Sequence, residues 1–271
     1  MPRLTASLAL VACSAVACVP NPDPPPGGGA AGSARPAARS GSSSRERTPM
    51  LQGERAGRPT APPSAVASAA ADPLLTTPFT DSFDRTSPGD DWRLTSAVWR
   101  IENGRLCGRS ARNHGAWLRR RLPVNARIEF DAYSSSTDGD LKAESWGDGA
   151  STATGTSYTN ATSYLTIFGG WKNRFHVLAR IDEHAPDRRQ IELTADSPEL
   201  RARPVKPGVG YHFKIERTDG KTVRWSVDDI ELLDYPDPEP LKGPGHEHFG
   251  FNDWEVPVCF DNLQVTPHPG A

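Results

Sequence analysis

The sequence predicts an all-β domain made of two packed antiparallel sheets and preceded by a long disordered region. Short segments of alternating polar and apolar residues recur between turn signals, and no window keeps the periodicity of a helix. The seven Trp, five Tyr and nine Phe all lie between positions 79 and 260. Roughly 190 residues are therefore left for one domain, which is enough to bury a core of its own.

The charge of the chain excludes one class of partner. Its 271 residues include 31 Lys and Arg against 33 Asp and Glu, so the formal net charge is −2. Proteins that bind nucleic acid through its phosphates need a basic excess on at least one surface. We therefore expect no nucleic-acid partner.

Residues 1–18 have the features of an export signal. Arg3 precedes an apolar stretch over 4–17, which as a helix reaches only ~21 Å and cannot span a ~30 Å hydrocarbon core. Cys13 and Cys18 each follow small residues and resemble the lipid-modified cysteine of bacterial lipoproteins. Cys18 is preferred because it leaves a more workable signal length. We expect a lipoprotein anchored to a membrane of the bacterial cell envelope, with ordinary secretion as the alternative.

The next segment, 19–75, is dominated by Pro, Gly, Ala and Ser and has no apolar periodicity. Such a segment buries too little surface to offset its conformational entropy, so we expect a disordered tether. As a flexible coil it would reach roughly 40 Å. The domain is expected at 76–267, followed by a short tail at 268–271.

Turn signals and alternation give the strands in order. Asn103-Gly104 predicts a hairpin between 99–102 and 105–107, and Asp219-Gly220 predicts another between 211–216 and 222–227. The other expected strands cover 127–133, 141–146, 164–168, 175–181, 248–251 and 256–265. About twelve strands in a domain of this size indicate two sheets packed face to face.

Several of these segments resemble strands of the concanavalin A-like lectin and glucanase group. The resemblance covers about 79–267 and rests on Phe79–Phe83, Trp99–Leu106, Ala126–Ala132, Trp225–Ile230 and Cys259–Val265. It implies a jelly-roll sandwich with a sheet that faces carbohydrate. Because lectins, hydrolases, lyases and receptor modules share this fold, the resemblance leaves the function open.

Strand alternation places Glu129 and Asp131 on the polar side of one strand, and Lys142 and Glu144 on the polar side of the next. If the two strands formed a hairpin, Glu129 would oppose Glu144 with their Cβ atoms ~4.5–5.5 Å apart. Two carboxylates at this distance suit a retaining glycosidase or an acid–base pair. The alternative is a solvated polar face. Laminarinase-like members of the group carry a third acidic residue where this chain has Ser134, which puts that mechanism in doubt.

Aromatic and polar residues that suit a sugar occur at further places along the chain. Sugar C–H faces stack on indole rings, and Arg pairs with carboxylates through two hydrogen bonds. The candidate ligand-binding residues are Asp131, Lys142, Trp146, Trp171, Arg180, Asp182, Asn252 and Trp254. His176 is, with Glu129 and Glu144, a candidate catalytic residue if the protein is an enzyme. A buried Trp171 and a structural Arg180–Asp182 pair are the alternatives.

We expect no metal or other cofactor. His246 and His248 share a face and suit two ligands of a zinc site, but no third ligand is evident. Ca²⁺ is the alternative, since Asn252, Asp253 and Glu255 offer oxygen atoms, although no loop signature supports it.

The two cysteines of the domain, Cys107 and Cys259, lie on its first and last strong strands. A jelly roll commonly places these strands side by side, and export permits a disulfide between them. Two buried free thiols are the alternative.

Three functions fit these observations. The preferred one is a cell-surface lipoprotein whose domain binds an oligo- or polysaccharide without catalysis. The first alternative is an exported glycoside hydrolase or polysaccharide lyase. The second is a structural or protein-binding lipoprotein of the envelope.

Overall fold

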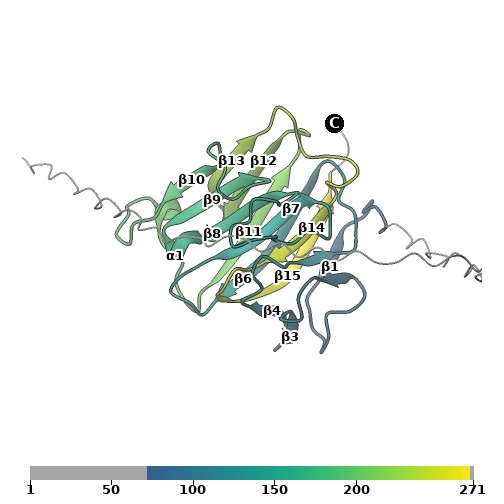
Figure 1. Ribbon diagram of the computed structural model, residues 1–271, viewed down its shortest axis with the longest axis horizontal. Helices are drawn as coiled ribbons and strands as arrows, with labels where there is room; N and C mark the ends of the chain where they lie inside the picture. The colour runs from purple at the N-terminus through teal and green to yellow at the C-terminus, as the bar shows by residue number, and fades with distance from the viewer. Residues whose placement is uncertain (1–71, 269–271) are drawn as a thin grey trace, which may run out of the picture. The chain divides into compact units, whose positions relative to one another are not determined.

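The computed structural model describes residues 72–268, which form a sandwich of two antiparallel sheets (Figure 1). The first sheet has the order β13-β12-β11-β6-β15-β4-β3, and β1 pairs with β15. Its strands are β1 (Phe79–Asp81), β3 (Arg100–Glu102), β4 (Arg105–Arg109), β6 (Ala126–Ser134), β11 (Gly210–Arg217), β12 (Thr222–Val227), β13 (Ile230–Pro236) and β15 (Pro257–Pro267). The all-β, two-sheet prediction is confirmed.

The second sheet has the order β10-β9-β8-β7-β14-β5-β2. Its strands are β2 (Trp92–Leu94), β5 (Ala116–Leu118), β7 (Leu141–Gly147), β8 (Tyr164–Gly169), β9 (Phe175–Arg180), β10 (Arg189–Glu192) and β14 (His248–Asn252). A single turn, α1 (Gly170–Asn173), joins β8 to β9, and a 3-10 turn follows β10 at Leu200–Ala202. Within 72–268, no helix is long and apolar enough to cross a membrane.

The two hairpins expected from turn signals are present. In the first, Glu102 pairs with Arg105 around Asn103 and Gly104, whose φ angles are 50° and 71°. Positive φ at both positions matches the twist of the flanking strands, and Asn-Gly adopts it at little cost. In the second hairpin β11 pairs with β12 across Gly220, where φ is 73°.

The core lies between the sheets and follows the alternation of β6. Ile128, Phe130 and Ala132 of this strand are fully buried, and the residues between them are half-exposed. The Phe130 ring lies 4.9 Å from Phe213 of its own sheet and 5.1 Å from Phe251 of the other, measured between ring centroids. Phe130 therefore joins both layers in one apolar cluster.

The strands β6 and β7, which the sequence analysis paired as a hairpin, belong to different sheets. β6 pairs with β11 and β15, whereas β7 pairs with β8 and β14. The short connection between them crosses from one layer to the other. The expected opposition of Glu129 and Glu144 is therefore wrong, because Glu129 instead lies opposite Lys214 and Gln264.

The folded domain extends beyond both of its expected ends. The Asp72 carboxylate lies 3.2 Å from Arg93 and 3.4 Å from Arg119, and Leu75 is buried in the core. At the other end the His268 amide donates to the Asn125 carbonyl at 3.0 Å. The export signal, Cys13, Cys18 and most of the expected tether lie outside the described residues.

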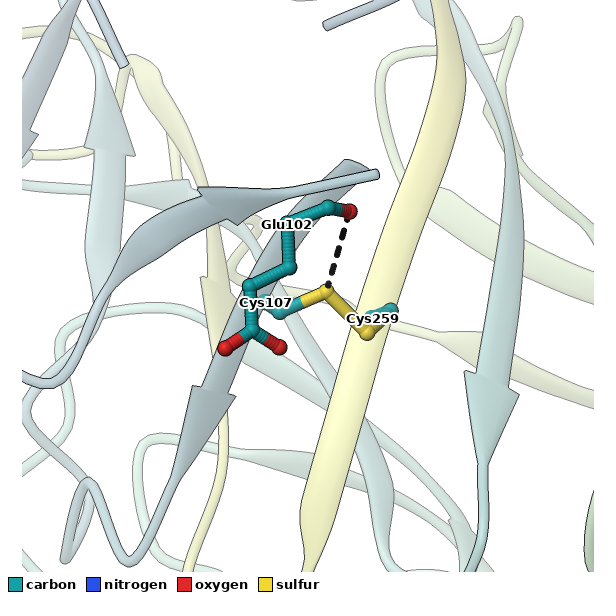
Figure 2. A group of neighbouring side chains, drawn as sticks. All are labelled: Glu102, Cys107 and Cys259. Atoms are coloured by element: carbon teal, nitrogen blue, oxygen red, sulfur yellow. Dashed lines mark hydrogen bonds between the residues drawn. A yellow bond between two sulfur atoms is a disulfide. The ribbon is translucent and has the colours of Figure 1, made fainter. Parts of the chain in front are cut away.

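Cys107 of β4 and Cys259 of β15 form a disulfide, drawn in Figure 2. The two residues are direct partners across the strands, with Cα atoms 4.0 Å apart. Glu102 lies beside them, and its backbone carbonyl is 4.0 Å from the Cys107 sulfur. These three residues are the one group of potential metal ligands that lie close together within 72–268, and both of its thiols are used by the disulfide.

Candidate functional site

A pocket of ≈ 490 Å³ opens on the outer face of the second sheet, the face turned away from the first sheet. Leu141 and Ala143 of β7 point into the core, so the alternating Lys142 points to the outer face. The pocket residues that bear on its chemistry are Asp140, Lys142, Trp171, Glu183, His184 and Trp254. Three of them, Lys142, Trp171 and Trp254, were expected from the sequence.

The ammonium group of Lys142 is fixed at the floor of the pocket. Its Nζ lies 3.0 Å from Glu183 Oε2 and donates to Asn113 Oδ1 at 2.8 Å. Burial alone would lower the pKa of Lys142, but the charges of Asp140 and Glu183 outweigh burial and raise it. The group therefore stays protonated, so it acts as a fixed positive charge and not as a base.

Asp140 is held at the start of β7 by an unusual backbone. Gly139 and Asp140 have φ angles of 68° and 65°, and the Asp140 amide donates to the Gly169 carbonyl at 3.0 Å. A Cβ atom on Gly139 would lie 2.5 Å from that same carbonyl, so only glycine fits there. Desolvation raises the pKa of Asp140, although the charge of Lys142 opposes the rise.

Trp171 projects from a left-handed turn between β8 and β9. Trp171, Lys172 and Asn173 have φ angles of 52°, 59° and 61°, a conformation that costs free energy for residues with a side chain. The side chain of Asn173 holds the turn. Its Nδ2 donates to the Val205 carbonyl at 2.8 Å, and its Oδ1 accepts from the Val205 amide at 2.9 Å. The strained turn sets where the Trp171 indole lies.

Arginine side chains hold both pocket indoles. The guanidinium of Arg188 lies 4.7 Å from the Trp171 ring, and that of Arg112 lies 4.6 Å from the Trp254 ring. Arg112 is in turn paired with Glu255 at 2.6 Å. Neither arginine is among the residues that line the pocket, so both rings keep a surface for a ligand.

The loop 148–163 covers the outer face beside the pocket and buries Glu144. Tyr158 of the loop packs with Leu165 and Val177 in a small apolar cluster on this face. The Glu144 carboxylate accepts from Ser163 Oγ at 2.6 Å and Tyr158 Oη at 3.2 Å. Burial raises the pKa of Glu144 to about 7, against the lowering effect of its hydrogen bonds.

Asn252 belongs to the same buried network and does not face the pocket. Its side-chain amide donates to Glu144 Oε1. The neighbouring Asp253 is also fully buried and accepts hydrogen bonds from the amides of Ala111 and Val256 at 3.0 and 3.1 Å. Burial raises the pKa of Asp253 to about 7. Asn252 Oδ1 accepts from the Asp253 amide at 2.7 Å, so the oxygens of Asn252 and Asp253 that would suit Ca²⁺ accept hydrogen bonds within the protein.

Trp146 and His176, both expected at the site, lie in the interior. Trp146 has a φ of 53° next to a register shift between β7 and β14, which turns its ring into the core. There its Nε1 donates to the Pro123 carbonyl at 3.0 Å. His176 stacks on Phe168 with ring centroids 4.1 Å apart, and burial lowers its pKa to about 3.

The remaining expected residues are spread over other surfaces. Asp131 lies on the outer face of the first sheet, 2.9 Å from His212 Nδ1. Arg180 pairs with Asp237 at 2.8 Å, so its partner is not Asp182. Asp182 instead accepts from the His184 amide at 2.7 Å and shapes the turn that carries His184.

His246 and His248, the pair that would suit two ligands of a zinc site, have separate partners. His246 Nδ1 lies 2.7 Å from the Thr162 carbonyl, and His248 Nε2 lies 3.3 Å from Asp72. Neither belongs to a group of three ligating side chains within the described part of the chain.

Two pocket residues, Asp140 and Glu183, were not predicted as site residues. Strand alternation puts Asp140 on the same polar face as Lys142 and Glu144 but does not distinguish it from other polar residues, and Glu183 lies in a loop. The Gly-Asp pair is the one local signal for Asp140, because both residue types tolerate positive φ. Nothing near Glu183 in the sequence indicates its ion pair with Lys142, 41 positions away.

No protein-family model matches the sequence, and no curated protein matches it. Similar solved structures include the carbohydrate-binding module CBM66 from Bacillus subtilis, at 18% identity and a TM-score of 0.46 over 67% of this chain and 96% of that one. The alginate lyase Aly36B has 10% identity and a TM-score of 0.48 over 72% and 98%. A native glycosidic hydrolase has 10% identity and a TM-score of 0.48 over 73% and 99%.

Proposed function

We propose that the domain binds a carbohydrate in the pocket between Trp171 and Trp254. The observation that carries the proposal is the placement of two indoles around a polar floor that holds Asp140, Lys142 and Glu183. Indole rings provide flat apolar surfaces for the C–H faces of a sugar, and the floor provides donors and acceptors for its hydroxyl groups. The half-buried rings are held in place before a ligand arrives, which limits the entropy cost of binding.

The positions of the charged side chains favour binding without catalysis over an enzyme. Glu129 and Glu144 lie on different sheets, and Glu144 is covered by the loop 148–163. The protonated Lys142 is tied to Glu183. Asp140 supports the enzyme alternative, since a carboxyl with a raised pKa suits a general acid. Release of new reducing ends or unsaturated sugars from a polysaccharide would establish the enzyme instead.

Substitution of the two indoles tests the binding site. After a glycan array has identified a ligand, Trp171→Ala and Trp254→Ala are each expected to weaken binding by ~1–3 kcal/mol in calorimetry, as loss of an aromatic anchor does. Tyr133→Ala is the matched control, because Tyr133 is a half-buried aromatic residue under Arg105, 4.0 Å away, on the opposite outer face. Equal affinities for all four proteins would place the ligand elsewhere.

The setting of the domain is the second part of the proposal. An exported lipoprotein, joined to its lipid through Cys18 or Cys13, would present the pocket at the cell envelope. The support is the sequence of residues 1–18 alone. Replacement of both cysteines by Ser is expected to move the protein from the membrane to the soluble fraction, because anchoring depends on acyl chains. Retention of the double variant in the membrane fraction would contradict lipidation.

A further inference from the structure

The charges that line the pocket are not evenly matched. Lys142 pairs with Glu183 at 3.0 Å, and its charge also acts on Asp140. Glu255 pairs with Arg112 at 2.6 Å. Asp140 forms no ion pair with any residue in 72–268, although it lies at the floor beside these groups. Lys172 and Arg174 also line the pocket, but both are exposed, where water screens their charges. The inner pocket therefore holds two carboxylates, those of Asp140 and Glu183, against the single charge of Lys142, and Asp140 is the one without a direct ion pair.

The backbone keeps this carboxylate in place beside one of the two indoles. The hydrogen bond from the Asp140 amide ends on Gly169, two residues before Trp171. The backbones of Gly139 and Gly169 approach so closely that a side chain on Gly139 would clash with Gly169. Asp140 and Trp171 line the same pocket, so one ligand can contact both.

A half-buried carboxylate without a direct ion pair favours a positively charged partner. Desolvation already raises the pKa of Asp140, so an incoming cation recovers free energy that the folded protein has lost. A hydroxyl group can also donate a hydrogen bond to a carboxylate, but it carries no charge to offset that of Asp140, whereas an ammonium group does both. A sugar carboxylate would be repelled at short range. A ligand that satisfies both Asp140 and Trp171 therefore needs a cationic group and a ring that can stack within the same sugar unit.

Resting on the proposed function, we infer that the pocket selects a sugar with a free amino group, whose ammonium pairs with Asp140 while the ring stacks on Trp171. Glycans that contain de-N-acetylated hexosamine units are the class of ligand that supplies both features. The inference concerns which sugar is preferred, whereas the proposed function concerns whether the pocket binds sugar at all.

Three tetrasaccharides with the same linkage test this preference. They are tetramers of glucosamine, of N-acetylglucosamine and of glucose, which differ only in the substituent at one carbon of each ring. The full chain at neutral pH is expected to bind the glucosamine tetramer about tenfold more tightly than the glucose tetramer, because the ammonium group adds a charge–charge attraction that the hydroxyl group lacks. Asp140→Asn is expected to bring the two affinities within about threefold of each other. Asn also accepts positive φ, so this variant keeps the backbone of the turn.

Asp131→Asn is the matched control, because it removes the same charge from the outer face of the first sheet. It is expected to keep the full preference for the amino sugar. Retention of the preference by Asp140→Asn, or its equal loss in both variants, would overturn the inference. Equal binding of all three tetramers through Trp171 and Trp254 would overturn it too, while leaving the proposed function intact. Failure of every array sugar to bind would refute both.

Discussion

The two outer faces of the sandwich carry similar residues in different surroundings. Each has acidic groups, basic groups and an aromatic ring under an arginine, Tyr133 with Arg105 on one face and Trp254 with Arg112 on the other. On the first sheet, the carboxylates of Glu129 and Asp131 stay partly exposed.

On the second sheet, the loop 148–163 and the turns around the pocket bury the corresponding groups. Lys142, Glu144 and Asp253 are each at most 2% exposed. The difference shows that strand composition alone does not create a site. Loops that exclude water turn a polar sheet face into one where charges interact strongly.

The largest expected effect separates a core indole from a pocket indole. Trp146→Ala is expected to lower the free energy of unfolding by ~3–5 kcal/mol, because it leaves a cavity between the sheets. Trp171→Ala is expected to change it by less than ~1 kcal/mol, since the ring is partly exposed. Denaturant titration measures both. A large loss in Trp171→Ala would show that this ring is structural and would remove the main support for the binding site.

A smaller, pH-dependent effect is expected at Glu144. Burial raises its pKa from 4.5 to about 7, so the folded protein holds this proton where the unfolded chain has lost it. The neutral carboxyl contributes stability that is fully present below the unfolded pKa of 4.5 and is lost as pH rises through about 7. Glu144→Gln stays neutral, so its stability relative to the unaltered protein is expected to rise by ~2–3 kcal/mol from pH 5 to pH 8.

Asp253 and His176 titrate in both the unaltered protein and Glu144→Gln. The difference between their curves of stability against pH therefore reports the titration of Glu144 alone. Denaturant midpoints across the pH range measure it. A constant difference at every pH would mean that the loop 148–163 does not exclude water from Glu144.

The smallest effect is expected on the first sheet. Glu129 lies 2.9 Å from Arg127, and its side chain is 21% exposed. Glu129→Gln is expected to change stability by no more than ~1 kcal/mol, as loss of an exposed ion pair does. It is also expected to leave sugar binding unchanged in calorimetry. Weaker binding in this variant would show that the first sheet contributes to the site.

The strands were predictable from the sequence because turn chemistry and alternation are local. Asn103-Gly104 set the first hairpin, and the apolar positions of β6 set its buried face. The connection between β6 and β7 was misread, since a short polar link looks the same whether it turns within a sheet or crosses to the other. Trp146 was misplaced because positive φ beside a register shift reverses its face.

The pocket was only half predictable for a related reason. A tryptophan by itself suggests a surface on which a sugar can stack, so the two indoles could be chosen from the sequence. Asp140 and Glu183, in contrast, gain their roles from contacts with distant segments. The link between Gly139 and Gly169 joins positions 30 residues apart, and no local pattern reports it. Residues in loops have no alternation from which a face can be read.

The seven indole N–H groups offer the most direct test of the pocket. In a ¹⁵N-labelled protein each gives a separate NMR signal, assigned by single Trp→Phe substitutions. Titration with the array ligand is expected to shift the signals of Trp171 and Trp254 with one common dissociation constant, while those of the buried Trp146 and Trp225 stay in place. Shifts confined to other indoles, with Trp171 and Trp254 unmoved at saturation, would contradict sugar binding in this pocket.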